Sequence, residues 1–103
     1  MIRVVFNGSR AVWIAGHARF ADFGEDIACA SVSSAVQLCA NGITEVLRVD
    51  AQVNVHENEV SISLPIDSNS TAEAFIEALR LHLIILQEQF PESIEIMEEK
   101  VND

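Results

Sequence analysis

Basic residues are scarce in this sequence. Its 103 residues include six Lys and Arg against sixteen Asp and Glu, which gives a formal net charge of −10. Nucleic acid is therefore not expected as a direct partner, because phosphate binding needs clustered Lys and Arg side chains. A basic protein or peptide is a partner that such an acidic chain accommodates more easily.

Cysteine is also rare, with one residue at Cys29 and one at Cys39. The N-terminal residues 1–6 contain no long apolar core and no small-residue cleavage site, so they do not predict a secretory signal. We therefore expect a cytoplasmic protein whose thiols are reduced rather than joined in a disulfide. The cysteines and the three histidines lack the close-paired spacing of zinc ligands, so no metal and no cofactor are expected.

Linkers, low-complexity segments and internal repeats are absent from the sequence. The length predicts a single domain, residues 1–103, which is too small to hold a core and a separate substrate domain. Any catalytic site must therefore share its residues with the fold.

Two β-hairpins are predicted. The β-favouring runs 2–6 and 11–16 are joined through an Asn-Gly pair, which is a strong turn signal. Apolar and polar residues then alternate over 49–55 and over 60–64, on either side of a turn at 56–58. This alternation predicts an antiparallel pair with one apolar face and one polar face that is open to water or to a peptide.

The first helix is predicted within residues 27–44, which contain no charged residue. Serines and polar residues such as Gln37 are too frequent for a membrane span, so no membrane association is expected. Because a charge-free helix of this length is expected to be covered on more than one side, we predict a homodimer. Asn41-Gly42 predicts a left-handed end of the helix. An apolar stripe at helical spacing is formed by Val32, Val36, Cys39 and Ile43.

The second helix is predicted to open with a capping box at 70–73 and to stop at Phe90-Pro91. Residues 94–97 could return as a short last strand. The predicted order is ββαββα with a possible fifth strand, which indicates an α+β fold. Its mixed sheet would carry the two long helices on one face.

The stretch from Gly16 to Ser34 combines a histidine, a cysteine, a glycine-containing loop and a helix start. Asp26 is a good N-cap residue, which would place Cys29 at the third helical position. A thiol in the first turn of a helix is favoured as thiolate by the positive end of the macrodipole. Glu25 and Asp26 oppose this effect, so a nearby histidine such as His17 is needed to activate the sulfur.

His17 and Cys29 are twelve positions apart, so a nucleophile and its base could meet only if the intervening loop folds back. Two simpler interpretations remain open from the residues alone. Cys29 could be a small apolar core residue, and His17 could be a surface or packing residue.

The loop between them carries two aromatic residues, Phe20 and Phe23. These rings could form a lid that shelters the site and grips an apolar substrate side chain, with Gly24 as its hinge. They could equally plug the edge of the core. Asp22 is a candidate to orient His17, whereas Asp26 is better explained as the helix cap.

This stretch resembles the ribosomal-processing cysteine proteases, a family of small bacterial proteins. The shared elements are a Gly-His-Ala, a loop ending in Gly-x-Asp and a helix start Cys-Ala-x-Val-Ser, and a Phe-Pro pair near the end of the chain also matches. Ala28, Ser31 and Glu25 depart from the residues usual in the family. The shared elements here are Gly16-His17-Ala18, Gly24-Glu25-Asp26, Cys29-Ala30-Ser31-Val32-Ser33 and Phe90-Pro91.

The resemblance implies that His17 is the general base and Cys29 the nucleophile of a cysteine endopeptidase. In that family the enzyme removes a short N-terminal extension from a large-subunit ribosomal protein, so the expected partner is a basic ribosomal-protein peptide. The alternative is a non-catalytic, dimeric ribosome-associated interaction protein in which Cys29 is structural. A redox thiol sensor is least favoured, because no resolving cysteine is close to Cys29 in the sequence.

Overall fold

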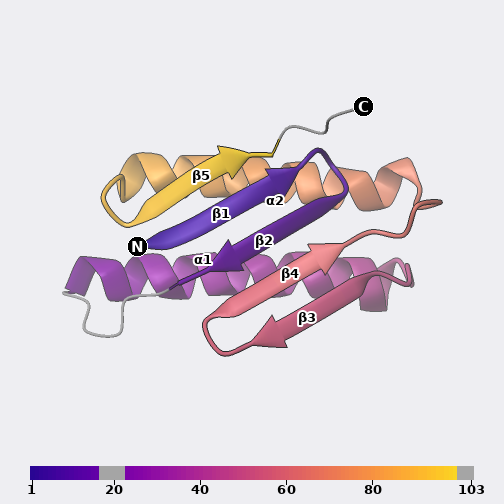
Figure 1. Ribbon diagram of the computed structural model, residues 1–103, viewed down its shortest axis with the longest axis horizontal. Helices are drawn as coiled ribbons and strands as arrows, with labels where there is room; N and C mark the ends of the chain where they lie inside the picture. The colour runs from indigo at the N-terminus through magenta and orange to yellow at the C-terminus, as the bar shows by residue number, and fades with distance from the viewer. Residues whose placement is uncertain (17–22, 100–103) are drawn as a thin grey trace.

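The computed structural model describes the backbone of residues 1–16 and 23–99, with side chains for 1–16 and 27–99. Five strands form one mixed sheet in the order β3-β4-β2-β1-β5, and both long helices lie behind the same face of it (Figure 1). The predicted α+β fold, its two hairpins and its fifth strand are therefore confirmed. The elements are β1 (Ile2–Asn7), β2 (Ala11–Ala15), α1 (Phe23–Asn41), the π-helical η1 (Gly42–Val46), β3 (Gln52–His56), β4 (Glu59–Ser63), α2 (Ser70–Gln89) and β5 (Ile94–Glu98).

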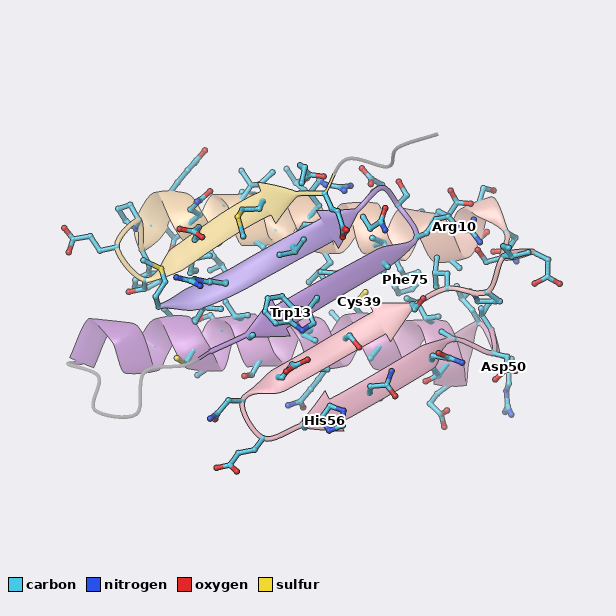
Figure 2. The ribbon with its side chains drawn as sticks, in the orientation of Figure 1. Arg10, Trp13, Cys39, Asp50, His56 and Phe75 are labelled. Atoms are coloured by element: carbon cyan, nitrogen blue, oxygen red, sulfur yellow. The ribbon has the colours of Figure 1, made fainter. Side chains whose placement is uncertain are left out.

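In the middle of the sheet, the face toward the helices is apolar and buried, and the opposite face is not covered by the helices. On β2, Val12 and Ile14 are 2% and 5% exposed, whereas Trp13 lies on the face turned away from the helices (Figure 2). The indole N–H of Trp13 donates to Oε1 of Glu59 on β4 at 2.7 Å. One sheet face thus builds the core, and the other stays accessible, as period-two alternation requires.

The core lies between the sheet and the helix pair. The predicted stripe on the first helix is buried at all four positions, and burying one such aliphatic side chain stabilises the fold by about 1.5–3 kcal/mol. The segment Ile27–Val46 is long and apolar enough to cross a membrane by length and composition. A core helix meets the same criterion, and the stripe belongs to the hydrophobic core cluster of the described residues. The largest fully buried side chains are Phe6, Ile43, Ile62, Ile76, Leu83, Ile94, Val4 and Val12.

The predicted left-handed helix end at Asn41-Gly42 is wrong. Asn41 has right-handed helical angles, and the chain continues through η1 before the left-handed residue Arg48 is reached, at φ 60°. Gly42 is instead required by a close approach, because a Cβ atom there would overlap the ring of Phe75 on α2. Glycine at this position therefore lets the two helices pack closely.

The start of α2 lies one residue away from the predicted capping box. The N-cap is Asn69, whose extended backbone lets its side-chain Oδ1 accept from the N–H of Ala72 at 2.9 Å. Asn is as good an N-cap as Ser, so the preceding residue competes successfully for this role. The predicted end at Phe90-Pro91 is confirmed, because Phe90 is the C-cap and its N–H donates to the carbonyl of Leu86.

Arg80 on α2 ties three elements together. Its guanidinium lies 4.5 Å from the ring centroid of Phe6 on β1, donates to the carbonyl of Gly8, and pairs with Glu98 at 3.0 Å and with Glu77. The hydroxyl of Ser9 donates to Glu77, and together with Arg80 it holds the pKa of the Glu77 carboxyl below its ordinary value. This network fastens the β1–β2 turn to α2 and β5.

Candidate active site

Cys29 lies on α1, half-buried, in the wall of a cavity of about 500 Å³. The cavity is enclosed by α1 on one side and by the ends of β2, β3 and β4 on the other. A half-buried thiol in a concave site fits a nucleophile better than a core position does. Besides Cys29, the wall is formed by Ile14, Gly16, Ala30, Val32, Ser33, Val36, Gln37, Val55, His56, Asn58, Glu59 and Val60.

Gly16 lines the same cavity as Cys29 and directly precedes His17 in the chain. Its φ is 81°, and a Cβ atom there would lie 2.6 Å from the carbonyl oxygen of Met1. Its N–H donates to the carbonyl of Asn58 at 2.8 Å. Glycine is therefore needed at the point where the chain leaves β2 for the segment that carries the expected base.

Three of the predicted site residues lie outside the described residues. These are the expected base His17, its expected orienter Asp22, and Phe20, one of the two expected lid aromatics. Their roles stay predictions. The structure fixes the anchor points on either side of this segment, Gly16 and the start of α1 at Phe23.

The first helix begins four residues earlier than predicted, at Phe23. Gly24 is therefore inside the first helical turn rather than a loop hinge, and Asp26 is also inside it rather than at the N-cap. The residue types permit this, because Glu25 and Asp26 are acidic and acidic residues are favoured in the first turn. Phe23 likewise belongs to the helix backbone rather than to a lid loop.

Cys29 is consequently the seventh residue of α1 and not the third. The free N–H groups of a helix belong to its first four residues, and the macrodipole effect falls off within the first turn. Activation of this thiol by the helix end is therefore weaker than the sequence indicated. The requirement for a partner base is correspondingly stronger.

Cys39 forms no disulfide, and it is a core residue as predicted, 4% exposed. Its thiol donates to the carbonyl of Phe75 at 3.6 Å between α1 and α2 (Figure 2). Burial raises the pKa of the Cys39 thiol to about 11. At neutral pH it is protonated, and a protonated, buried thiol is a poor nucleophile.

The two described histidines occupy different surfaces. His56, predicted as a solvated turn residue, is exposed at the end of β3 but also borders the Cys29 cavity, which sequence reasoning missed. Strand alternation puts its side chain on the open face with Glu59, its cross-strand partner. His82 is exposed and lines a separate groove between α1 and α2. Among the residues with described side chains, no group of three or more His, Cys, Asp or Glu could hold a metal ion.

Comparison with known proteins identifies the family and the fold. Residues 1–95 match the sequence family described as the cysteine protease Prp. No curated protein matches the chain significantly. The fold is shared with the essential ribosomal processing protease Prp of Staphylococcus aureus in complex with a substrate peptide, at TM-score 0.82 and 19% identity over 95% of this chain and 97% of that one.

Two further crystal structures are similar. One is the same Staphylococcus aureus protease with a covalently linked product peptide, at TM-score 0.79 and 20% identity over 95% and 97% of the chains. The other is SMU.848 from Streptococcus mutans, at TM-score 0.78 and 25% identity over 96% and 99%. Fold, cavity and family match together define a cysteine protease. The chain belongs to the Prp family of these enzymes.

Proposed function

We propose that this cysteine protease is an endopeptidase that removes a short N-terminal extension from a large-subunit ribosomal protein, with Cys29 as nucleophile and His17 as general base. One observation carries the proposal: Cys29 and Gly16, the residue directly before His17, line the same cavity. The Staphylococcus aureus relatives, described as a ribosomal processing protease, were crystallised with substrate and product peptides. The proposal places the protein in the cytoplasm, where ribosomal proteins are made.

The proposed reaction follows thiol protease chemistry. His17 takes the proton of Cys29, and the thiolate attacks the scissile carbonyl carbon. The carbon–nitrogen bond breaks as the imidazolium gives its proton to the leaving amine. A water molecule, deprotonated by His17, then hydrolyses the thioester and releases the carboxylate product with Cys29 regenerated. The free N–H groups of α1 are about one turn away from Cys29, so they are not assigned as oxyanion donors.

The charge of the chain supports a basic substrate. Three described arginines lie next to carboxylates: Arg3 is 3.9 Å from Glu95, Arg10 is 3.8 Å from Glu73, and Arg80 pairs with Glu77 and Glu98. Of the side chains that the structure describes, no Lys or Arg lines the cavity. A peptide from the basic tail of a ribosomal protein fits these surroundings.

The proposal is tested with a peptide that copies the N-terminal extension of the host's large-subunit ribosomal protein. Wild type should cleave it, and Cys29→Ala and His17→Ala should each lower kcat/KM at least about 100-fold. His82→Ala is the matched control, because its side chain lines a separate groove between α1 and α2, and it should retain cleavage. Activity retained in Cys29→Ala or in His17→Ala would refute the assignment of that residue.

We also propose that the enzyme is a homodimer joined through the outer surface of the two helices. Leu38 on α1 is 73% exposed, and Leu81 on α2 is 61% exposed. A groove of about 730 Å³ runs between the two helices, and Leu38 lines it. Large exposed apolar side chains around a groove are typical of an association surface. Leu38→Glu should convert the dimer to a monomer in sedimentation velocity, and an unchanged mass would contradict this interface.

The second candidate function is a non-catalytic, dimeric ribosome-associated protein with a structural Cys29. The exposed helix residues that support a dimer are compatible with it. The two candidates differ in the chemistry of Cys29, since a structural thiol needs no base and no accessible cavity. Reactivity no faster than that of a free peptide thiol, together with no cleavage by wild type, would favour this alternative.

A further inference from the structure

β3 is the terminal strand of the sheet, on the side of the Cys29 cavity. Two hydrogen bonds between the ends of β2 and β4 show which backbone groups of β4 face β2 and which face β3. Asn58 accepts from Gly16, and the N–H of Leu64 donates to the carbonyl of Arg10 at 2.8 Å, so even-numbered residues from 58 to 64 direct their backbone groups toward β2. The odd-numbered residues of β4 therefore face β3.

The register between β3 and β4 shows which residues of β3 direct their backbone groups toward β4 and which direct them outward. The odd residues of β4 lie opposite Gln52, Asn54 and His56, which therefore exchange their hydrogen bonds with β4. The N–H and C=O groups of Val53 and Val55 point away from β4. Within the described part of the chain no strand lies beyond them. The free edge thus presents two residues with unused strand-pairing groups.

The side chain of Val55 joins this edge to the active-site cavity. In the register Val55 lies opposite Val60, and Val60 lies opposite Ile14, so all three are on the helix side of the sheet. Ile14 is buried there, but α1 does not cover Val55, which is 72% exposed. Val55 and Cys29 line the same cavity.

The opposite wall of the cavity is formed by one face of α1. Cys29, Ser33 and Gln37 are spaced four residues apart, so they share one helical face, and all three border the cavity. At 1.5 Å per residue they span about 12 Å. An extended chain advances about 3.3 Å per residue, so this wall matches about four residues of an extended peptide.

From this geometry we propose that the substrate binds as an added strand on the free edge of β3. It pairs through the backbone groups of Val53 and Val55 and places alternate side chains in the cavity beside Cys29. This inference rests on the proposed protease function and specifies how that site holds a peptide. Strand addition gives affinity through the main chain, while pockets for alternate side chains give specificity.

The occupant is an extended peptide with an apolar side chain at the cavity and basic residues flanking it. Five branched aliphatic side chains are part of the cavity wall, namely Ile14, Val32, Val36, Val55 and Val60. The rim is acidic, because Glu59 borders the cavity and Glu57 lies in the turn between two lining residues. No Lys or Arg of residues 1–16 and 27–99 lines the cavity to oppose a cationic peptide.

Val55→Pro tests the edge directly. Proline removes the outward N–H of this residue but no bond to β4, and proline is tolerated on edge strands where the N–H faces outward. We expect kcat/KM for the ribosomal-protein peptide to fall at least tenfold, mainly through KM. The rate of Cys29 alkylation by iodoacetamide should stay unchanged, which shows that the thiol and the fold are intact. Unaltered KM in a folded Val55→Pro enzyme would overturn strand addition.

Val55→Ala separates the backbone from the side chain. This variant keeps the N–H and shortens the apolar side chain, so it should raise KM less than Val55→Pro does. If both variants lose cleavage equally, the contribution comes from the side chain alone and strand pairing is refuted.

A second measurement uses wild-type enzyme and so does not depend on the folding of a variant. A series of substrate peptides, each N-methylated at one residue, should lose cleavage with a period of two, because alternate residues turn their N–H groups toward β3. Uniform tolerance of N-methylation would refute strand pairing.

Peptide binding to Cys29→Ala distinguishes this inference from the proposed function. Hydrogen exchange at the N–H groups of Val53 and Val55 should slow when the peptide is added. Protection of these N–H groups without cleavage by wild type would refute the protease assignment but support strand addition. Cleavage by wild type without protection would support the protease assignment but refute strand addition. Protection that appears with protein concentration in the absence of peptide would mean that a second copy covers this edge, which overturns the proposal.

Discussion

The backbone N–H of Gly16 donates to the carbonyl of Asn58 at 2.8 Å and thereby joins the end of β2 to the turn between β3 and β4. Both residues border the cavity that contains Cys29. The chain therefore enters the His17 segment from a fixed point on the cavity wall. Small changes at this point should affect catalysis as well as stability.

Gly16→Ala should destabilise the protein and lower its activity. The φ of 81° strains any L side chain, and the new Cβ would meet the carbonyl oxygen of Met1 at 2.6 Å. We expect a loss of about 1–3 kcal/mol in the free energy of unfolding, measured with urea, and a lower kcat in the fraction that folds. Gly8→Ala is the control, because φ is 56° there but no atom lies within 4 Å. Equal effects of the two substitutions would contradict the role given to the Gly16 contact.

The two cysteines should differ in reactivity. Iodoacetamide at pH 7.5 should modify Cys29 first, because it is half-buried in an open cavity, while Cys39 is buried with a raised pKa. Mass spectrometry of a time course should find a single alkylation under native conditions and a second only after denaturant is added. The Cys29→Ala variant should resist native alkylation altogether. Rapid native modification of Cys39 would contradict its position in the core.

The Cys39 thiol predicts a loss of stability at alkaline pH. Its pKa is raised from the model-compound value of 9.0 to about 11 in the fold, so the folded state holds this proton more tightly than the unfolded state. The stabilisation is complete below pH 9 and is lost as the pH rises toward 11. The difference corresponds to about 3 kcal/mol at most. Cys39→Ala should show a flatter decline of unfolding free energy between pH 9 and 11, and an unchanged slope would refute the assignment.

Gly42→Ala should destabilise the helix pair through Phe75. The added methyl would overlap the aromatic ring, which cannot shift without disturbing the packing of α1 against α2. Overpacking of this kind costs about 1–3 kcal/mol. The variant Phe75→Leu provides the room, so the double variant should be more stable than the sum of the two single losses predicts. Strict additivity in urea denaturation would show that the two residues do not interact.

Much of the fold follows from local patterns. The alternation over 49–64 and the Asn-Gly turn predict both hairpins, and the uncharged stripe on the first helix predicts its buried face. These features depend on residues near one another in the chain, which is why periodicity is sufficient. The start of the first helix is different, because Phe23, Gly24 and Asp26 suit either a loop and cap or a first helical turn.

Other features depend on contacts between distant segments. Gly42 is glycine because of Phe75, which is 33 positions away, and no local pattern can reveal this. The Cys29 thiol is predicted from its motif, but the valines opposite it, such as Val55, read only as strand residues. Their exposure depends on which part of the sheet α1 covers. The cavity is therefore a product of the topology, and the sequence predicts only one of its walls.

Trp13 gives the molecule a built-in optical reporter. It is the single tryptophan of the chain, and its indole is hydrogen-bonded to Glu59, the first residue of β4 and the partner of His56 at the end of β3. Displacement of the edge hairpin by a ligand would alter the polarity around the indole. Intrinsic fluorescence can therefore follow movement of the edge hairpin in unlabelled protein.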